Sequence, residues 1–365
     1  MSWRETTLGE ITDLKRGFDL PKSQRLQGDV PVYSSSGITG SNSTAAVEGP
    51  CVITGRYGTI GEVFFSGGPC WPLNTALYST EFNGNNPRFV YYLLQTIPWQ
   101  GYTTASAVPG VNRNHVNLCP VKIPDKATQD AIVEVLDSIV DKNALNNRLN
   151  DYLEQLVDGK FQELFGGLNF NATLSDVAEI TMGQSPAGSS YNEEGAGIIF
   201  YQGRGEFGWR FPKRRLYTTE PKRLACEGDV LMSVRAPVGD LNVAFENCCI
   251  GRGLAAIHSE TPSFALYLMR FLKPQLEAYN GEGTVFGSIN GKALKSLEVA
   301  LPSHNEVMQF ESFAAPIDAL IRSNENETRK LNNLRNYLLP KLMSGEIDVS
   351  KVDLTQLTNN HLAGC

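Results

Sequence analysis

Two halves of the sequence resemble each other, and this internal repeat constrains the fold more than any other feature. The run Thr7–Ile11 reappears as Thr173–Val177 and Gly17 reappears as Gly183, both at an offset of 166, and further along the chain the offset becomes 178. Each copy consists of a Gly-rich body with short apolar runs, followed by a long amphipathic segment. The amphipathic segments agree position for position, whereas the bodies agree only at turns and edges. We therefore expect one framework, used twice, that carries two different surfaces.

The bulk composition is that of an ordinary globular protein with room for two or three domains. The chain has 365 residues, of which 41% are hydrophobic and 19% charged. No apolar run is long enough for a membrane-spanning helix and Met1–Glu5 begins no signal peptide, so we expect a soluble, cytoplasmic protein. The seven cysteines form no Cys-x-x-Cys pair, which predicts reduced thiols that mostly fill the core.

Both bodies, residues 1–125 and 167–303, show short apolar runs such as Cys51–Thr54 that are separated by Gly and Pro. This pattern predicts short, mostly antiparallel strands. One helix is expected in each body, over about 88–96 and 264–272. The sequence therefore predicts an α+β fold with two pseudo-repeated, β-rich bodies.

The segments 126–166 and 304–345 have apolar residues at spacings of mostly three, four and seven, which predicts two helices with apolar seams; a tail follows over 346–365. Asn324 and Thr328 interrupt the second seam, a usual way to fix register in a coiled coil. Each helix would be roughly 50–60 Å long, too long to pack against its own body alone.

We therefore predict that the two long helices form an antiparallel coiled coil that joins the bodies and holds them apart. The alternative is that each helix folds back on its own body as an ordinary core helix. The residues expected in the seam are Ile139, Leu149, Leu153, Leu156, Ile317, Leu331, Leu334 and Leu338.

Motifs for catalysis are missing. The sequence has no Gly-x-x-x-x-Gly-Lys-Ser/Thr loop, no His-Glu-x-x-His and no Asn/Asp-Pro-Pro-aromatic motif for amino methylation. The glycines of Gly281–Gly287 have the wrong spacing for a dinucleotide fold and predict a turn. The four histidines are scattered, and Glu220-Pro221-Lys222 lacks a partner carboxylate at strand spacing. We expect no catalytic residue, metal site or cofactor in this chain.

The net charge of −7 does not exclude nucleic acid, because the long helices and the tail hold −6 of it and the bodies only −1. Phosphates are attracted by the local positive electrostatic potential and not by the net charge. The segment 204–223 has seven cations against two glutamates, with four aromatic residues interleaved. A solvated hairpin face is the alternative. The phosphate-binding candidates in this segment are Arg204, Arg210, Lys213, Arg214 and Arg215.

Further candidates for DNA binding occur at turns that recur in the two halves. Arg56, followed by Tyr57, lies after a predicted strand, and Arg235 occupies the same place in the second half. An arginine on a tight turn can donate two hydrogen bonds to guanine or to a phosphate, although it can also be a solvated hairpin residue. The loops with Asn112 and Asn290 are also equivalent; asparagine suits adenine or phosphate but also caps helices. The other candidates are Lys15, Arg16, Arg25, Arg113, Gln184 and Lys292.

Taken together, these motifs resemble the specificity (S) subunit of type I restriction–modification systems over nearly the whole chain. The resemblance is carried by Trp3 with Thr7–Ile11, by the Gly-rich arginine turn, by Ile123-Pro124 with Gln129 and Ile132, and by Leu338–Ile347, which is the most specific match. The first helix departs from the pattern, because it ends in Leu156–Lys160 instead of repeating Leu-Pro-Lys-Leu.

The resemblance implies two target recognition domains joined by two antiparallel helices that act as a ruler. It implies a bipartite, asymmetric target in double-stranded DNA, two adenine-N6 methyltransferase subunits as partners, and a restriction subunit with ATP-driven translocation that can join them. S-adenosylmethionine, ATP and Mg²⁺ would bind to those partners, and this chain would be non-catalytic. The alternatives are a two-headed protein-binding scaffold without DNA contact and a tandem nuclease with an unfamiliar site.

Overall fold

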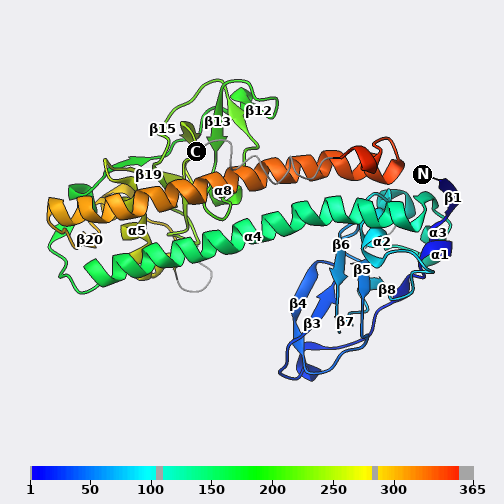
Figure 1. The fold of residues 1–365 in the computed structure, drawn as a ribbon. Coiled ribbons are helices and arrows are strands. Elements are labelled where there is room, and N and C mark those ends of the chain that lie inside the picture. Colours follow the sequence, from blue (N-terminus) through cyan, green and yellow to red (C-terminus); the bar gives the residue numbers. More distant parts are fainter. Residues whose placement is uncertain (1, 104–109, 282–286, 353–365) are drawn as a thin grey trace. The chain divides into compact units, whose positions relative to one another are not determined.

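The computed structural model of the chain describes residues 2–103, 110–281 and 287–352 (Figure 1). Its contacts form two compact units: unit 1 consists of residues 1–145 and 327–365, and unit 2 of residues 146–326. Each unit combines helices with β-sheets, as an α+β fold requires. The turn expected at Gly281–Gly287 and most of the expected tail lie outside the described residues. None of the helices in the described ranges combines the length and the hydropathy needed to cross a bilayer.

Two long helices dominate the fold, α4 (Lys126–Phe165) and α8 (His304–Ser344). The ranges expected from the sequence differ from these by one residue, at the carboxyl ends. Each unit contains one half of each helix, and within each unit the two halves run antiparallel (Figure 1).

Carboxylate caps explain where these helices begin. The Asp125 carboxylate accepts hydrogen bonds from the backbone N–H and the hydroxyl of Thr128, both at 2.9 Å. Before α8 the cap is reciprocal: the Glu306 carboxylate accepts the Ser303 N–H, and the Ser303 hydroxyl accepts the Glu306 N–H. These hydrogen bonds to the charged form lower the pKa values of Asp125 and Glu306.

The most specific motif of the sequence ends α8. Gly345 adopts a left-handed conformation with φ of 78°, and its backbone N–H bonds to Leu342 O. A Cβ at this position would lie 2.8 Å from the ring of Trp3. The glycine is therefore needed both for the helix end and for its packing against Trp3 in unit 1.

Unit 1 has short strands in three sheets, with the orders β2-β8-β5-β6, β4-β3-β7 and β1-β9. Its strands are β1 (Trp3–Thr7), β2 (Lys15–Arg16), β3 (Val30–Ser34), β4 (Gly37–Asn42), β5 (Cys51–Gly55), β6 (Val63–Ser66), β7 (Trp71–Pro72), β8 (Ala76–Ser79) and β9 (Pro120–Pro124). Its short helices are α1 (Leu8–Ile11), α2 (Pro87–Leu94) and α3 (Arg113–Asn117).

Unit 2 has sheets with the orders β11-β19-β16-β17, β12-β14-β13-β18-β15 and β10-β20. Its strands are β10 (Ala172–Thr173), β11 (Glu179–Met182), β12 (Tyr191–Asn192), β13 (Ile198–Tyr201), β14 (Tyr217–Thr218), β15 (Leu224–Ala225), β16 (Val230–Ser233), β17 (Leu241–Val243), β18 (Cys248–Ile250), β19 (Leu254–His258) and β20 (Glu298–Val299). Its short helices are α5 (Pro262–Phe271), α6 (Lys273–Glu277) and α7 (Gly291–Lys295).

The sequence repeat is also a repeat of strand register. Lys15 of β2 pairs with Tyr78 of β8, and Thr181 of β11 pairs with Ala256 of β19. Lys15 and Thr181 are related by the sequence offset of 166, and Tyr78 and Ala256 are related by the offset of 178. The glycine that recurs, Gly17 or Gly183, has the same function in both units. An added Cβ would lie 2.2 Å from a backbone carbonyl oxygen, that of Leu73 in unit 1 and that of Gly251 in unit 2.

In unit 1 the predicted apolar seam is correct. Ile139 on α4 and Leu331 and Leu338 on α8 are buried in one core, and Leu334 packs against its edge. The helix expected over about 88–96 is α2 (Pro87–Leu94), and its residues Phe89, Tyr92 and Leu93 belong to the same core.

In unit 2 the predicted seam on α4 is wrong. Leu149 and Leu156 are 38% and 53% exposed, and Leu153 is half-buried. The core of this unit contains Phe161 and Phe165 of α4 instead, whose rings lie 5.3 and 5.7 Å from that of Phe310 on α8. Phenylalanine removes more apolar surface from water than leucine, so the phenylalanine face of the helix turns inward. Ile317 on α8 packs at the edge of this core.

Candidate nucleic-acid interface

Unit 1 contains a polar hollow of about 740 Å³ that brings together six of the residues singled out in the sequence. Strand β2 contributes two of them, the turn after β5 two more, and the start of α3 the last two. They are Lys15, Arg16, Arg56, Tyr57, Asn112 and Arg113. Residues from three distant parts of the chain thus face one cavity.

The turn after β5 presents Arg56 and Tyr57 as a stacked pair. The guanidinium carbon of Arg56 lies 4.6 Å from the centre of the Tyr57 ring, and Tyr57 is 39% exposed. Tyr57 forms an isolated antiparallel β-bridge with Gly110, and a Cβ at Gly110 would lie 2.4 Å from the tyrosine ring. The glycine therefore leaves space for the ring.

The cations of this hollow differ in how far they are neutralised. Lys15 makes an ion pair of 2.5 Å with Glu81, and this hydrogen bond raises the pKa of Lys15. Arg16 lies 3.9 Å from Asp19. Of the cations that line the hollow, Arg56 and Arg113 make no ion pair with a described carboxylate; Arg113 donates one hydrogen bond of 3.5 Å to Leu14 O, and the other N–H groups of these two arginines are available for a phosphate or a base.

The two asparagines are helix caps. The side-chain oxygen of Asn112 accepts the N–H of Asn114 at 3.0 Å, and that of Asn290 accepts the N–H of Ala293 at 2.9 Å. Both residues therefore act as helix caps, and their amide nitrogens remain as donors for another partner.

Arg25 does not line the hollow. Its guanidinium donates a hydrogen bond of 2.9 Å to the backbone oxygen of Thr39 on β4, and the residue is half-buried. This contact supports the β3–β4 hairpin.

Unit 2 has a hollow of about 780 Å³ between the equivalent elements, β11 and α7. Its lining is different: Thr181 and Met182 stand where unit 1 has Lys15 and Arg16. The cations here are Arg223, Lys292 and Lys295. The sequence analysis did not identify Lys295. Its position one helical turn after Lys292, in the short helix that Asn290 caps, could have indicated that the two lysines share a face. Gln184 is exposed just after β11.

Arg235 is not the counterpart of Arg56. Arg235 forms an isolated β-bridge with Ser288, and Tyr57 forms the same kind of bridge with Gly110. The offset of 178 relates Tyr57 to Arg235 and Gly110 to Ser288, so Arg235 is the equivalent of Tyr57. The residue that corresponds to Arg56 is therefore Val234, which is buried. Neighbouring side chains on an extended segment point to opposite faces, so this shift by one position directs Arg235 differently from Arg56. Arg235 itself is exposed.

The basic segment 204–223 is less positive than its composition predicts. Arg204 makes an ion pair with Asp240, Arg214 with Glu246, and Arg215 with Glu206. Among the described residues, Lys213, Lys222 and Arg223 have no carboxylate within ion-pair distance. Only these three of the seven cations therefore carry a charge that no neighbouring carboxylate offsets.

Arg210 must be removed from the set of candidates for DNA contact. It is 4% exposed and bonds to Glu154 at 3.0 Å, Asp318 at 3.2 Å and the Tyr267 hydroxyl at 3.3 Å. Burial opposes its charge, but Tyr267, Asp318 and Glu154 outweigh this effect and raise the pKa of Arg210. Its function is to attach the body of unit 2 to both long helices.

Neither hollow is lined by a set of metal ligands. The described residues contain one group of His, Cys and Asp side chains that could hold a metal ion, formed by Cys226, Asp229 and His258 in unit 2. It lies at the end of β19, beside the strand β11 that lines the hollow of that unit.

Comparison with known proteins gives one family. A family model described as the type I restriction modification DNA specificity domain matches the chain twice, at residues 1–155 and 171–336. A protein of Methanocaldococcus jannaschii named "Putative type I restriction enzyme MjaX specificity subunit" is 29% identical over 373 residues, which cover 94% of this chain and 84% of that protein. The crystal structure of a type I restriction–modification system S subunit from M. genitalium has the same fold, with a TM-score of 0.65, 15% identity, and 94% and 96% of the two chains covered. Because the family model matches most of the sequence, this chain belongs to the specificity (S) subunit family of type I restriction–modification systems.

Proposed function

We propose that this chain is the DNA-recognition subunit of a type I restriction–modification complex and that it binds a bipartite, asymmetric target in duplex DNA. The observation that carries the proposal is that two equivalent elements, β2 and the start of α3 in unit 1 and β11 and α7 in unit 2, line a hollow in each unit, while the residues that line the two hollows differ. An equivalent position with different side chains suits two heads that read different bases.

In unit 1, we assign base reading to Arg56 and Arg113, because their guanidinium groups carry no ion pair among the described residues and can form two parallel hydrogen bonds with guanine. Tyr57 would stack on Arg56 and orient it. Lys15 and Arg16 also line the hollow and would contact phosphates that set the orientation, in exchange for their carboxylate neighbours Glu81 and Asp19.

In unit 2, we assign phosphate contacts to Lys292, Lys295 and Arg223, which line the hollow, and to the exposed Lys213. Base reading by this unit would depend more on neutral side chains such as Thr181 and Gln184. The two halves of the target should therefore differ in their sensitivity to salt, because the affinity of each half depends on how many phosphates it neutralises.

The partners would be two adenine-N6 methyltransferase subunits and, in a complete complex, restriction subunits. S-adenosylmethionine, ATP and Mg²⁺ would bind to those partners, and the chain itself would be non-catalytic. A partner surface is suggested by the exposed apolar residues Leu149, Tyr152 and Leu156 of α4, which follow one another at spacings of three and four and therefore share a face.

The long helices would fix the number of unspecified base pairs between the half-sites. Two heads that read one face of B-DNA need half-site centres about 34 Å apart, or one helical turn. Helices of 40 and 41 residues are long enough for such a spacer.

The test is to co-express the chain with the methyltransferase subunit of its own system in a host without adenine methylation and to map N6-methyladenine across the genome. We expect one split motif, with two short defined halves around a spacer of constant length. A contiguous motif would contradict the two-headed arrangement. A stable complex that adds no methylation would favour a protein-binding scaffold.

A further inference from the structure

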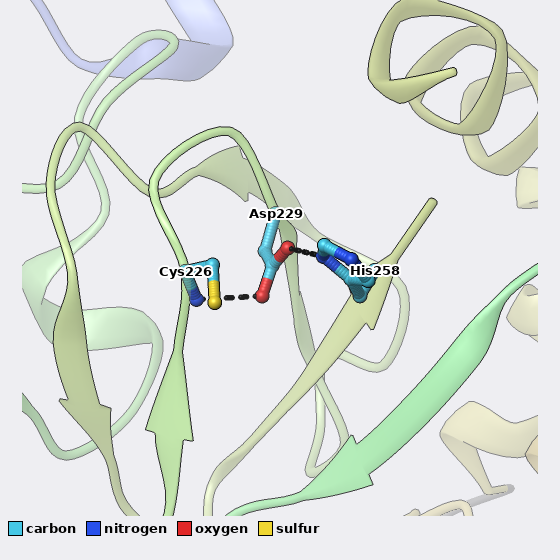
Figure 2. A group of neighbouring side chains, drawn as sticks. All are labelled: Cys226, Asp229 and His258. Atoms are coloured by element: carbon cyan, nitrogen blue, oxygen red, sulfur yellow. Dashed lines mark hydrogen bonds and ion pairs between the residues drawn. The ribbon is translucent and has the colours of Figure 1, made fainter. Parts of the chain in front are cut away.

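Three side chains that could bind a metal ion meet where the two central strands of the β11-β19-β16-β17 sheet, β16 and β19, begin and end (Figure 2). Cys226 directly follows β15, Asp229 directly precedes β16, and His258 is the last residue of β19. One ligand atom of each lies within 4.8 Å of the others. The sequence spacing does not reveal this group, since His258 is remote from Asp229 in the chain and joins it only through strand pairing.

The strand register explains why the group forms. Val230 of β16 pairs with Ile257 of β19, so the residues just outside this pair, Asp229 and His258, become neighbours. The tight turn 226–229, closed by a hydrogen bond of 3.1 Å from Asp229 N to Cys226 O, then places the thiol beside the carboxylate. All three residues are therefore held by backbone that the sheet fixes.

Asp229 is the anchor of the group. Its side chain is 6% exposed, one carboxylate oxygen accepts the Cys226 N–H at 2.7 Å, and the other lies 2.7 Å from His258 Nδ1. Cys226 is exposed and the His258 side chain is 52% exposed. The group thus has a buried carboxylate at its base and a thiol and an imidazole at its mouth, through which an ion can enter from solvent.

The surroundings favour a cation. Glu179 lies opposite His258 in the β11–β19 pairing, and Glu260 is close behind it in the chain. The nearby Glu227 is neutralised by Arg322 at 2.7 Å.

The donor types distinguish between metals. A thiolate, an imidazole nitrogen and a carboxylate oxygen are the ligands of Zn²⁺, whereas Mg²⁺ and Ca²⁺ take oxygen ligands. Bond lengths of about 2.0–2.3 Å in a tetrahedron place ligand atoms roughly 3.3–3.8 Å apart. Small side-chain rotations would bring the group into this range from its present spacing.

We propose that Cys226, Asp229 and His258 form a Zn²⁺ site, with water in the fourth position. Binding would release the thiol proton and any proton on the imidazole to solvent and would replace the contact between Asp229 and His258 by two metal bonds. The ion would tie the turn after β15 to the ends of β16 and β19. The corresponding positions of unit 1 are Glu48, Cys51 and Thr80, so we expect one ion per chain.

The first test uses Co²⁺ as a spectroscopic substitute for Zn²⁺ in the full-length chain. We expect one equivalent of Co²⁺ to give a thiolate charge-transfer band and the intense visible bands of tetrahedral coordination, and Zn²⁺ to abolish both. Cys226→Ser should remove the charge-transfer band, and His258→Gln should weaken binding by more than about tenfold, since even second-sphere partners act on that scale. The matched controls His304→Gln, which removes an imidazole outside the group, and Cys365→Ser should keep the spectrum.

A second test needs no substitution. Bound Zn²⁺ should slow the alkylation of Cys226 by iodoacetamide, measured by peptide mass spectrometry, and a chelator should restore the rate. An alkylation rate that Zn²⁺ leaves unchanged, or a thiolate band that survives in Cys226→Ser, would overturn the proposal.

Discussion

The side-chain amide of Asn324 on α8 donates a hydrogen bond of 2.8 Å to the side-chain oxygen of Asn150 on α4, and both residues are buried. This polar pair occupies the contact between the two helices in unit 2. A displaced register would break this hydrogen bond between two buried side chains, so the pair makes one alignment of the helices the favoured one, at some cost in stability.

Replacing one member of this pair should therefore cost more than replacing both. We expect Asn324→Leu to lower the free energy of unfolding by about 1–3 kcal/mol, because the side-chain oxygen of Asn150 loses its donor, while the Asn150 amide keeps its 3.5 Å contact with Glu325. The double variant with Asn150→Leu should recover most of this loss. Urea denaturation of the two single variants and the double variant gives the coupling energy, and additive losses would contradict a specific pair.

Arg210 and Lys213 provide a matched contrast within the basic segment. Arg210→Ala removes a guanidinium whose residue is 4% exposed and should destabilise unit 2 by about 3 kcal/mol. This is the lower end of the usual range, because Glu154 keeps its contact with Arg270 and Asp318 keeps Tyr267. Lys213→Ala should change stability by less than about 0.5 kcal/mol but weaken DNA binding. Thermal denaturation and DNA titration of both variants separate the two functions.

Arg56→Ala should relax the reading of one half-site by about 1–3 kcal/mol and leave the other half-site intact. The readout is the methylated motif of the variant complex, with Arg25→Ala as a control, since Arg25 lies outside the hollow. An equal loss at both half-sites would show that the two heads do not read independently.

Substitutions of a surface apolar residue and of a core apolar residue of α4 should have different effects, the first on assembly with the methyltransferase and the second on folding. Leu156→Ser should leave the stability of the chain nearly unchanged, because Leu156 is 53% exposed, but should weaken capture of the methyltransferase subunit. Phe161→Ala removes a buried ring that contacts other phenylalanines, among them Phe165, Phe264 and Phe310, and should cost about 3–5 kcal/mol. Co-purification and denaturation curves of the two variants test this contrast; a folding defect in Leu156→Ser would contradict the assigned exposure.

The cap at the start of α4 should contribute to stability only while Asp125 is ionised. Hydrogen bonds from Thr128 and Ser2 lower its pKa in the folded state below the ordinary value of 3.8. The contribution is therefore present above pH 3.8 and is lost as the pH falls through the lower, folded-state value. Asp125→Asn should be less stable than the parent at about pH 6, and the difference should shrink towards about pH 3. A constant difference between these pH values would contradict the role of the charge.

The unit 1 hollow shows how far local sequence leads to a site. Lys15, Arg56 and Arg113 were identified separately, from turns and basic runs, and strand pairing brought them to one cavity. The same reasoning failed for Arg235, because only the strand register shows that the offset of 178 already applies at this turn, which makes Arg235 the equivalent of Tyr57 and not of Arg56.

The sequence by itself determined the repeat, the α+β character and the positions of both long helices, because these follow from periodicity and caps between residues a few positions apart. Only the tertiary structure decided which face of α4 is buried in unit 2, where Phe161 lies in the core and Leu156 is exposed. It also decided that Arg210 binds Glu154 and Asp318, both remote in the chain, and is withdrawn from the surface. Burial and ion pairing depend on such distant partners, and no local pattern of residue types contains them.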